Sequence, residues 1–182
     1  IFESELQHSL AYVIAYLDLC EDNHVSAEHG FSTIISKATD KRVLLESRIN
    51  LAKIYAKGSQ LDKATDCLVS AIAAATSLKD SENLYVAHLM LADVVKQKDD
   101  EHAIEEELKH LSAAAANQAD TVKKTELHER MGVILLQANK IEESLEQYND
   151  ALLLAVKSTD TKNQQKKNHI RNLIDTCHNL SK

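Results

Sequence analysis

Hydrophobic residues recur along the chain at the spacing of amphipathic α-helices, and short polar clusters interrupt them at regular intervals. Segments of about sixteen residues place apolar positions at helical spacing, and the clusters between them fall about twenty residues apart. The clusters are Thr39-Asp40, Gly58-Ser59-Gln60, Lys79-Asp80-Ser81, Lys98-Asp99-Asp100, Ala119-Asp120-Thr121, Asn139-Lys140 and Thr159-Asp160-Thr161. This pattern predicts a succession of helices joined by short turns.

The polar clusters also carry helix-start signals. Several of them place Asp, Ser or Thr just before an apolar-periodic segment, where a side-chain oxygen can accept hydrogen bonds from free backbone N–H groups. Connections this short force neighbouring helices to pack antiparallel. Antiparallel helix pairs at a fixed period form a solenoid, because each pair buries its apolar face against the next.

Composition supports helix throughout. The 182 residues include no proline and three glycines, and aromatic residues make up 4%. A domain rich in strands normally uses more glycine and proline in its turns. Alanine, leucine, lysine, glutamate and glutamine are good helix formers and dominate the sequence. We therefore expect an all-α fold.

An internal repeat underlies the helical pattern. Large and small apolar residues alternate in a fixed order, and this order returns after forty residues and again after another forty. The three sets are Leu51, Ala52, Tyr55, Ala64, Leu68, Ala71; Leu91, Ala92, Val95, Ile104, Leu108, Leu111; and Met131, Gly132, Leu135, Ser144, Tyr148, Ala151. A degenerate first set contains Ile14, Ala15, Ala27, Phe31 and Ile34, with Asp18 in place of a large apolar residue. The small residues allow two helix backbones to approach closely.

This order of large and small residues resembles the tetratricopeptide repeat (TPR) family. The usual repeat has about 34 residues, so the longer repeat here implies helices extended by nearly a turn. It is similar to the elongated variant of bacterial signalling regulators and of polarity and cell-division scaffolds. The resemblance implies one TPR-like domain over residues 1–182, wound as a right-handed superhelix. Its repeats would span about 2–38, 41–78, 81–118 and 121–158, with a closing helix at 161–180.

In this family the first helix of each repeat lines a concave face that binds partners. Carried over position by position, the resemblance implies a partner-binding set of Tyr12, Tyr16, Glu46, Ile49, Lys53, Lys57, Val86, Leu89, Asp93, Lys96, Gln97, Glu129 and Val133. Tyrosine is a good interface anchor because it offers a large contact area with few rotatable bonds. The alternative is that Tyr12, Ile49, Leu89 and Val133 pack inside a tighter superhelix.

A chaperone-binding role is not expected. TPR proteins that bind Hsp70 or Hsp90 tails hold the terminal carboxylate with a fixed set of Lys, Asn and Arg residues. The corresponding positions here are Tyr12, Tyr16, Asn50, Val86 and Met90, so only Asn50 fits the pattern. The resemblance therefore implies a protein or peptide partner of another kind.

The charge distribution argues against nucleic acid as a partner. The formal net charge is −7, with both signs interleaved along the chain. A nucleic-acid footprint needs a clustered basic face. The strongest basic cluster is Lys162, Lys166, Lys167, His169 and Arg171, which we interpret as a solvated helix face.

No arrangement of residues indicates catalysis, a cofactor or a metal ion. The nine histidines include no pair four residues apart and no H-E-x-x-H motif, and the three glycines are isolated. Cys20, Cys67 and Cys177 lie far apart in apolar-periodic contexts, which predicts small buried hydrophobic residues. The chain is not expected to be an enzyme.

The sequence also bears on compartment. No apolar run approaches the ~18 residues needed to cross a bilayer, and no signal peptide is visible. A cytoplasmic protein is expected, with a periplasmic one as the alternative if the chain belongs to a larger sensor. Because the sequence begins at Ile1, we expect it to be an excised or processed piece.

Three hypotheses for function remain. The favoured one is a protein-interaction scaffold that holds a peptide or a partner helix in its concave groove. The second is a sensory or regulatory region of a larger signalling enzyme or transcription regulator. The third is self-association as a homo-oligomer, through the apolar stripe of the last helix that includes Leu173 and Ile174.

Overall fold

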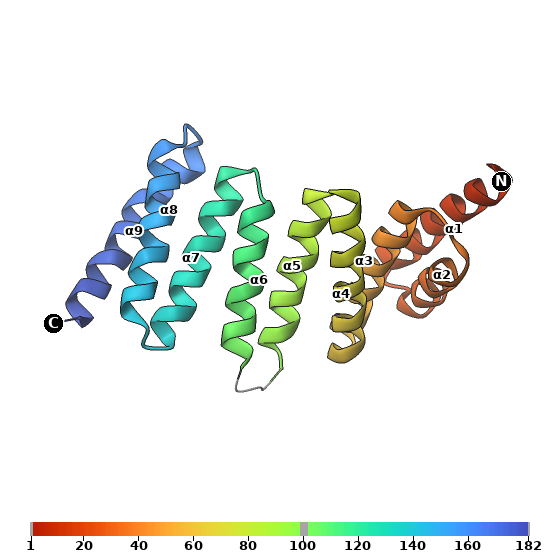
Figure 1. The fold of residues 1–182 in the computed structure, drawn as a ribbon, viewed down its shortest axis with the longest axis horizontal. Coiled ribbons are helices and arrows are strands. Elements are labelled where there is room, and N and C mark those ends of the chain that lie inside the picture. The colour runs from red at the N-terminus through yellow and green to blue at the C-terminus, as the bar shows by residue number, and fades with distance from the viewer. Residues whose placement is uncertain (1, 99–101, 182) are drawn as a thin grey trace. The chain divides into compact units, whose positions relative to one another are not determined.

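A computed structural model describes residues 2–98 and 102–181, with side chains described from Glu5 onward, and these residues form α-helices joined by short turns (Figure 1). The helices are α1 (Phe2–Cys20), α2 (His24–Lys37), α3 (Lys41–Lys57), α4 (Leu61–Leu78), α5 (Ser81–Lys96), α6 (Ala103–Asn117), α7 (Thr121–Gln137), α8 (Ile141–Lys157) and α9 (Thr161–Leu180). The predicted all-α helical repeat is confirmed.

The chain divides into two compact units. Unit 1 covers residues 1–100 and contains α1 to α5, and unit 2 covers residues 101–182 and contains α6 to α9. The border falls inside the third expected repeat, 81–118. The single domain, its four repeats and its superhelical winding stay predictions.

Within each unit, helices that follow one another in sequence pack side by side. In unit 1 this holds from α1 to α5, and in addition α3 contacts both α1 and α5. In unit 2, α7 packs against both α6 and α8, while α9 packs on α8 and also contacts α7. Unit 1 therefore has one layer made of α1, α3 and α5 and a second layer made of α2 and α4. We call the odd-numbered helices α1 to α7 the A helices and the even-numbered ones the B helices.

The turns that lead into α3, α5, α7 and α9 share one device. Each has an aspartate at the N-cap whose side chain accepts a hydrogen bond from a backbone N–H of the first helical turn. These residues are Asp40, Asp80, Asp120 and Asp160, spaced forty residues apart. They confirm the helix starts predicted from the polar clusters, since a capping carboxylate satisfies N–H groups that have no partner inside the helix.

The turns from an A helix to the following B helix use a different device. Asp22, Ser59 and Asn139 occupy equivalent positions in three of these turns, and each adopts a positive φ of 57 to 60°. Left-handed backbone favours glycine, and asparagine and aspartate tolerate it better than most other residues. The equivalent residue of the third turn, Asp99, lies outside the described residues.

The core of unit 1 is built from small and large residues in the predicted order. Ala15, Phe31, Ile34, Leu51 and Ile54 form a buried cluster that joins α1, α2 and α3. A Cβ atom placed on Gly30 would lie 2.7 Å from the Cβ of Ala15, so α1 and α2 are closest here. The first repeat is thus a helix pair in spite of Asp18, whose carboxylate accepts a hydrogen bond from the Ser26 hydroxyl at 2.7 Å.

The core of unit 2 is centred on a tyrosine. Tyr148 is fully buried and belongs to a cluster with Ala151, Ala155, Ile170 and Cys177 that joins α8 to α9. On α7, Gly132 lies against the Tyr148 ring, because a Cβ at that position would be 2.5 Å from Cε1 of the ring. On α9, Ile170 and Cys177 are buried in this core, and Leu173 and Ile174 are partly buried against it, while Leu180 is 58% exposed.

Two residues of α1 depart from the sequence prediction. Ile14 occupies the repeat position of Leu51 and Met131, yet it is 54% exposed while they are 5% and 4% exposed. Cys20, predicted to be buried, is also exposed, whereas Cys177 is buried and Cys67 is partly buried. The repeat pattern marks positions that another helix covers in later repeats, and no described helix covers this side of α1.

Candidate functional site

The three A helices of unit 1 together line an open groove. α1 supplies Tyr12 and Tyr16, α3 supplies Glu46, Ile49, Asn50 and Lys53, and α5 supplies Glu82, Asn83 and Val86. The groove holds about 330 Å³. Its lining alternates aromatic or aliphatic groups with carboxylates, amides and one ammonium group.

Tyr12 is held at the centre of a polar network. The Asn50 amide donates a hydrogen bond to the Tyr12 hydroxyl oxygen at 3.0 Å, and the Lys53 ammonium donates to the Asn50 side-chain oxygen at 3.0 Å. The Tyr12 hydroxyl in turn donates to the Glu46 carboxylate. The ring makes an edge contact with Phe31 of the core at a centroid distance of 5.8 Å. Tyr12 therefore joins the groove to the core.

The surroundings of this network shift two ionisation equilibria. Burial, reinforced by the nearby Glu46 carboxylate, raises the pKa of Tyr12 to about 12. Burial lowers the pKa of Lys53. Both shifts result from partial removal of the groups from water, where charged forms are best solvated. At neutral pH the groove thus presents a neutral phenol beside a partly desolvated ammonium group.

Tyr16 is the exposed aromatic side chain of the groove. It is 45% exposed, and its ring stacks on that of Tyr12 at a centroid distance of 6.2 Å and an interplanar angle of 18°. Ile49 is only 4% exposed and forms part of the floor. An exposed tyrosine supported from below by a fixed second ring is a preorganised contact surface, since little conformational freedom remains to be lost on binding.

The structure gathers six of the expected binding residues in this groove: Tyr12, Tyr16, Glu46, Ile49, Lys53 and Val86. The other members of the set in unit 1 lie outside its lining. Lys57 forms an ion pair with Asp22 at 2.9 Å, and the Gln97 side chain donates to the Asp93 backbone oxygen at 3.0 Å. Leu89 is partly buried and Lys96 is exposed. That these residues bind a partner stays a prediction.

Three lining residues were absent from the expected set: Asn50, Glu82 and Asn83. Asn50 is 4% exposed and supports Tyr12, a role that only the fold discloses. Glu82 and Asn83 lie in the first turn of α5, before the first position of the family pattern. The forty-residue repeat could have indicated Glu82 and Asn83, because it implies an extra turn in each A helix, and that turn adds residues to the groove. Asp80 fixes Asn83, accepting hydrogen bonds from its backbone N–H and its amide, and these bonds lower the pKa of Asp80.

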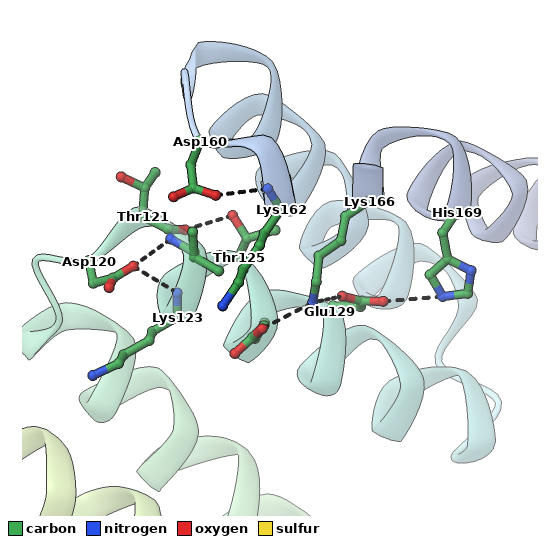
Figure 2. Close-up of polar contacts among 11 residues, drawn as sticks. Asp120, Thr121, Lys123, Thr125, Glu129, Asp160, Lys162, Lys166 and His169 are labelled. Carbon is green, nitrogen blue, oxygen red and sulfur yellow. Dashed lines mark hydrogen bonds and ion pairs between the residues drawn. The ribbon is translucent and has the colours of Figure 1, made fainter. Parts of the chain in front are cut away.

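The two expected residues of unit 2 lie on α7. Figure 2 shows that Glu129 contacts two side chains of α9: its Oε2 atom lies 3.2 Å from Lys166 Nζ, and its Oε1 atom lies 3.2 Å from His169 Nε2. Lys166 also lies 3.3 Å from Glu126. Val133 is 38% exposed. Glu129 thus links α9 to α7, and the charge of Lys166, a member of the basic cluster, is partly neutralised there.

A second cleft lies within unit 2, lined by α6, α7 and α8. Leu108, Met131 and Leu135 are its apolar residues, and Ser112, His128, Glu143, Glu146, Gln147 and Asp150 are its polar ones. The Nδ1 atom of His128 lies 3.0 Å from the Gln147 side-chain oxygen and 4.0 Å from Asp150. Within the described ranges, 2–98 and 102–181, no three histidine, cysteine or acidic side chains gather closely enough to hold a metal ion.

None of the helices described is both long enough and apolar enough to span a lipid bilayer.

Three solved structures resemble more than nine-tenths of the chain. One is a Signal Transduction ATPase with Numerous Domains (STAND) protein from Pyrococcus horikoshii that has a tetratricopeptide repeat sensor. The match covers 98% of this chain and 27% of the STAND chain, with a TM-score of 0.67 and 17% identity. BtubC (BKLC) from P. vanneervenii matches 92% of this chain and 75% of its own with a TM-score of 0.64 and 14% identity. The TPR-like repeats of a putative kinesin light chain from Podosopora anserina match 96% and 95%, with a TM-score of 0.63 and 12% identity. The fold is a TPR-like helical repeat.

No protein-family model matches the sequence, and no curated protein sequence matches it. TPR-like and other solenoid folds generally act as scaffolds, since stacked repeats create an extended surface for a protein partner. The match to the STAND protein covers about a quarter of that longer chain, and at these identities it concerns the fold alone.

Proposed function

We propose that this TPR-like chain is a protein-interaction scaffold and that the groove of unit 1 binds a segment of its partner. The observation that carries the proposal is the pair of stacked tyrosines, one fixed by the network of Asn50, Glu46 and Lys53 and the other 45% exposed. Such a surface combines an accessible aromatic anchor with polar groups that are already oriented.

The lining also suggests the form of the bound segment. Three A helices contribute to the wall, so a segment lying across them contacts α1, α3 and α5 in turn. An extended peptide contacts all three more readily than a compact domain does, because the lining residues are spread over three helices. Ile49 and Val86 favour an apolar side chain near the Tyr16 ring, while Glu46 and Glu82 favour a polar or basic neighbour.

Selection of peptides tests this proposal and does not require the partner to be identified. Random peptides displayed on phage are selected on the immobilised chain, and the dissociation constants of the selected peptides are measured by fluorescence anisotropy. We expect Tyr16→Ala to weaken binding by about tenfold or more, which corresponds to loss of an anchor worth at least about 1.4 kcal/mol. Lys53→Ala is expected to weaken it as well, by removing the hydrogen bond that orients Asn50 beneath Tyr12.

A matched control separates the groove from the general surface. Val69 on α4 is 54% exposed and is not among the groove residues, so Val69→Ala is expected to leave affinity unchanged. Ile49→Ala is not a suitable test, because Ile49 is buried and its truncation destabilises the unit. Selected peptides that bind the Tyr16 and Lys53 variants as well as the original chain would show that the groove is not the binding site.

A further inference from the structure

Helix α1 exposes a continuous apolar stripe that the groove does not use. The exposed fractions are 71% for Leu6, 60% for Leu10, 49% for Val13, and 54% for both Ile14 and Leu17. These residues are spaced at i, i+4, i+7, i+8 and i+11, which places them along one side of a helix. Single exposed apolar residues are ordinary, but a contiguous stripe of this kind marks an interaction surface.

The internal repeat identifies what normally covers this face. Ile14 of α1 corresponds to Leu51 of α3, so the stripe residues Leu10, Val13, Ile14 and Leu17 correspond to Ser47, Asn50, Leu51 and Ile54. All four α3 residues are buried, with exposed fractions between 0% and 7%. Leu51 and Ile54 belong to one core cluster with Phe31 and Ile34 of α2. On α3, therefore, the preceding repeat covers the face that is open on α1: α2 packs on Leu51 and Ile54, and α1 supplies Ala15 to the same cluster and Tyr12 beside Asn50.

The same face of α7 is covered in the same way. Leu127 and Met131 are each 4% exposed, and they correspond to Leu10 and Ile14 of α1. The α7 residue equivalent to Val13 is Arg130, which forms an ion pair with Glu107 of α6 at 2.6 Å. A helix in this position thus buries apolar residues and can also pair charges across the contact.

The charges of α1 select among possible occupants. Helix α1 and the turn after it, residues 2–22, have five acidic residues, Glu3, Glu5, Asp18, Glu21 and Asp22, and neither lysine nor arginine; of the five, Asp22 is paired with Lys57 of α3. A second copy of α1 would bring acidic residues together, which is unfavourable. On α9 of a second copy, Ile170 and Cys177 are buried and Leu173 and Ile174 are partly buried against α8, which leaves a smaller apolar surface than that of α1. Charge complementarity favours a helix that carries basic residues.

We propose that the exposed apolar face of α1 binds an amphipathic helix of a partner protein, with lysine or arginine at its edges, in the position relative to α1 that α2 holds relative to α3. The stripe residues Leu6, Leu10, Val13, Ile14 and Leu17 provide the contact area. None of them lines the groove, so this second surface is independent of the first. A partner that uses both surfaces gains affinity from two linked contacts.

Two synthetic peptides and one double variant test the proposal. The first peptide, of about 18 residues, has leucines at i, i+3, i+4 and i+7 on one face and lysines and arginines at the edges. The second keeps the leucines and has glutamates at the edges. We expect the basic peptide to bind the chain about tenfold or more tightly than the acidic one at low salt. Leu10→Ser with Ile14→Ser is expected to weaken the basic peptide by about tenfold or more.

Two controls show whether a loss of peptide binding is due to the α1 face itself. Leu10 and Ile14 are exposed, so the double variant is expected to keep its helical circular dichroism, and Lys53→Ala in the groove is expected to bind the basic peptide unchanged. Equal binding of the two peptides, or undiminished binding by the double variant, would refute the proposal. Sedimentation that shows a dimer converted to a monomer by the double variant would refute it in favour of a second copy. Neither result bears on the groove, which the Tyr16 and Lys53 variants test separately.

Discussion

Gly132 of α7 packs so closely against the Tyr148 ring that no larger residue fits there without a shift of the structure. A Cβ atom there would lie 2.5, 2.7 and 2.9 Å from three carbon atoms of the Tyr148 ring, whereas ordinary contacts are 3.4 to 4 Å. The ring is rigid and fully buried, and its cluster includes Ala151, Ala155 and Ile170. Either the ring or the α7 backbone must therefore move by about 1 Å to admit alanine.

The expected result of Gly132→Ala follows from two opposing effects. Overpacking a close-packed core destabilises by about 1–3 kcal/mol. Replacing a mid-helix glycine with alanine stabilises by about 1 kcal/mol. We expect overpacking to dominate, with a net loss of about 1–2 kcal/mol in the free energy of unfolding. Urea denaturation followed by circular dichroism measures it, with thermal denaturation as a check, where about 2–4 °C per kcal/mol is expected.

A second substitution makes the test specific to the ring. At the equivalent positions of the second repeat, Ala52 and Leu68 are both fully buried. Tyr148→Leu removes the ring and is expected to destabilise the original chain by about 1–2 kcal/mol through the cavity it leaves. In combination with Gly132→Ala it recreates the alanine–leucine pair, so we expect a favourable coupling of at least about 1 kcal/mol in the double-mutant cycle.

Two results would refute this reasoning. A stabilised Gly132→Ala variant would show that helix propensity dominates and that the Tyr148 ring yields easily. Effects that add to within about 0.3 kcal/mol in the double variant would show that residues 132 and 148 do not interact.

Three further predictions concern polar groups. Arg130→Met leaves the Glu107 carboxylate, 6% exposed, without its partner at 2.6 Å, and urea unfolding should show a loss of about 3 kcal/mol, whereas Lys57→Met at an exposed ion pair should change stability by less than about 1 kcal/mol. Asp120→Ala removes the N-cap bonds to α7 and should reduce the free energy of unfolding by about 1 kcal/mol, with the m-value unchanged. The raised pKa of Tyr12 stabilises the fold below its unfolded value of 10.0, and this stabilisation declines as pH rises towards 12. Tyr12→Phe should therefore abolish part of the stability lost between about pH 10 and 12, roughly 1 kcal/mol after allowance for solvent screening, and an unchanged pH profile would contradict this.

The arrangement of helices was predictable because its determinants are local. The capping aspartates and the order of large and small residues lie within a few turns of the contacts they specify, so a forty-residue period in sequence becomes a forty-residue period in structure. The positive φ of the residues at the A-to-B turns, such as Ser59 and Asn139, was not predictable. The sequence shows these residues only as members of polar clusters between helices.

The groove was predictable only in outline. Family positions identified the side of the A helices that carries Tyr12, Tyr16 and Lys53, but they do not fix what each side chain contacts. Lys57 lies one turn after the groove residue Lys53 on α3 and instead pairs with Asp22 in the turn between α1 and α2. Ile14 shows the other limit: its repeat position indicates burial, and whether a neighbouring helix exists to bury it depends on the fold rather than on the pattern.

The aspartate caps have a consequence for how the chain can be lengthened or shortened. Because Asp40 and Asp80 begin their helices through bonds confined to a few residues, the joint between one repeat and the next is self-sufficient. Removal of residues 40–79 would connect Thr39 directly to Asp80 and recreate the same helix start. Gene segments cut just before these aspartates are therefore expected to be exchangeable modules, whereas a cut between an aspartate and the first turn of its helix separates the helix from its cap.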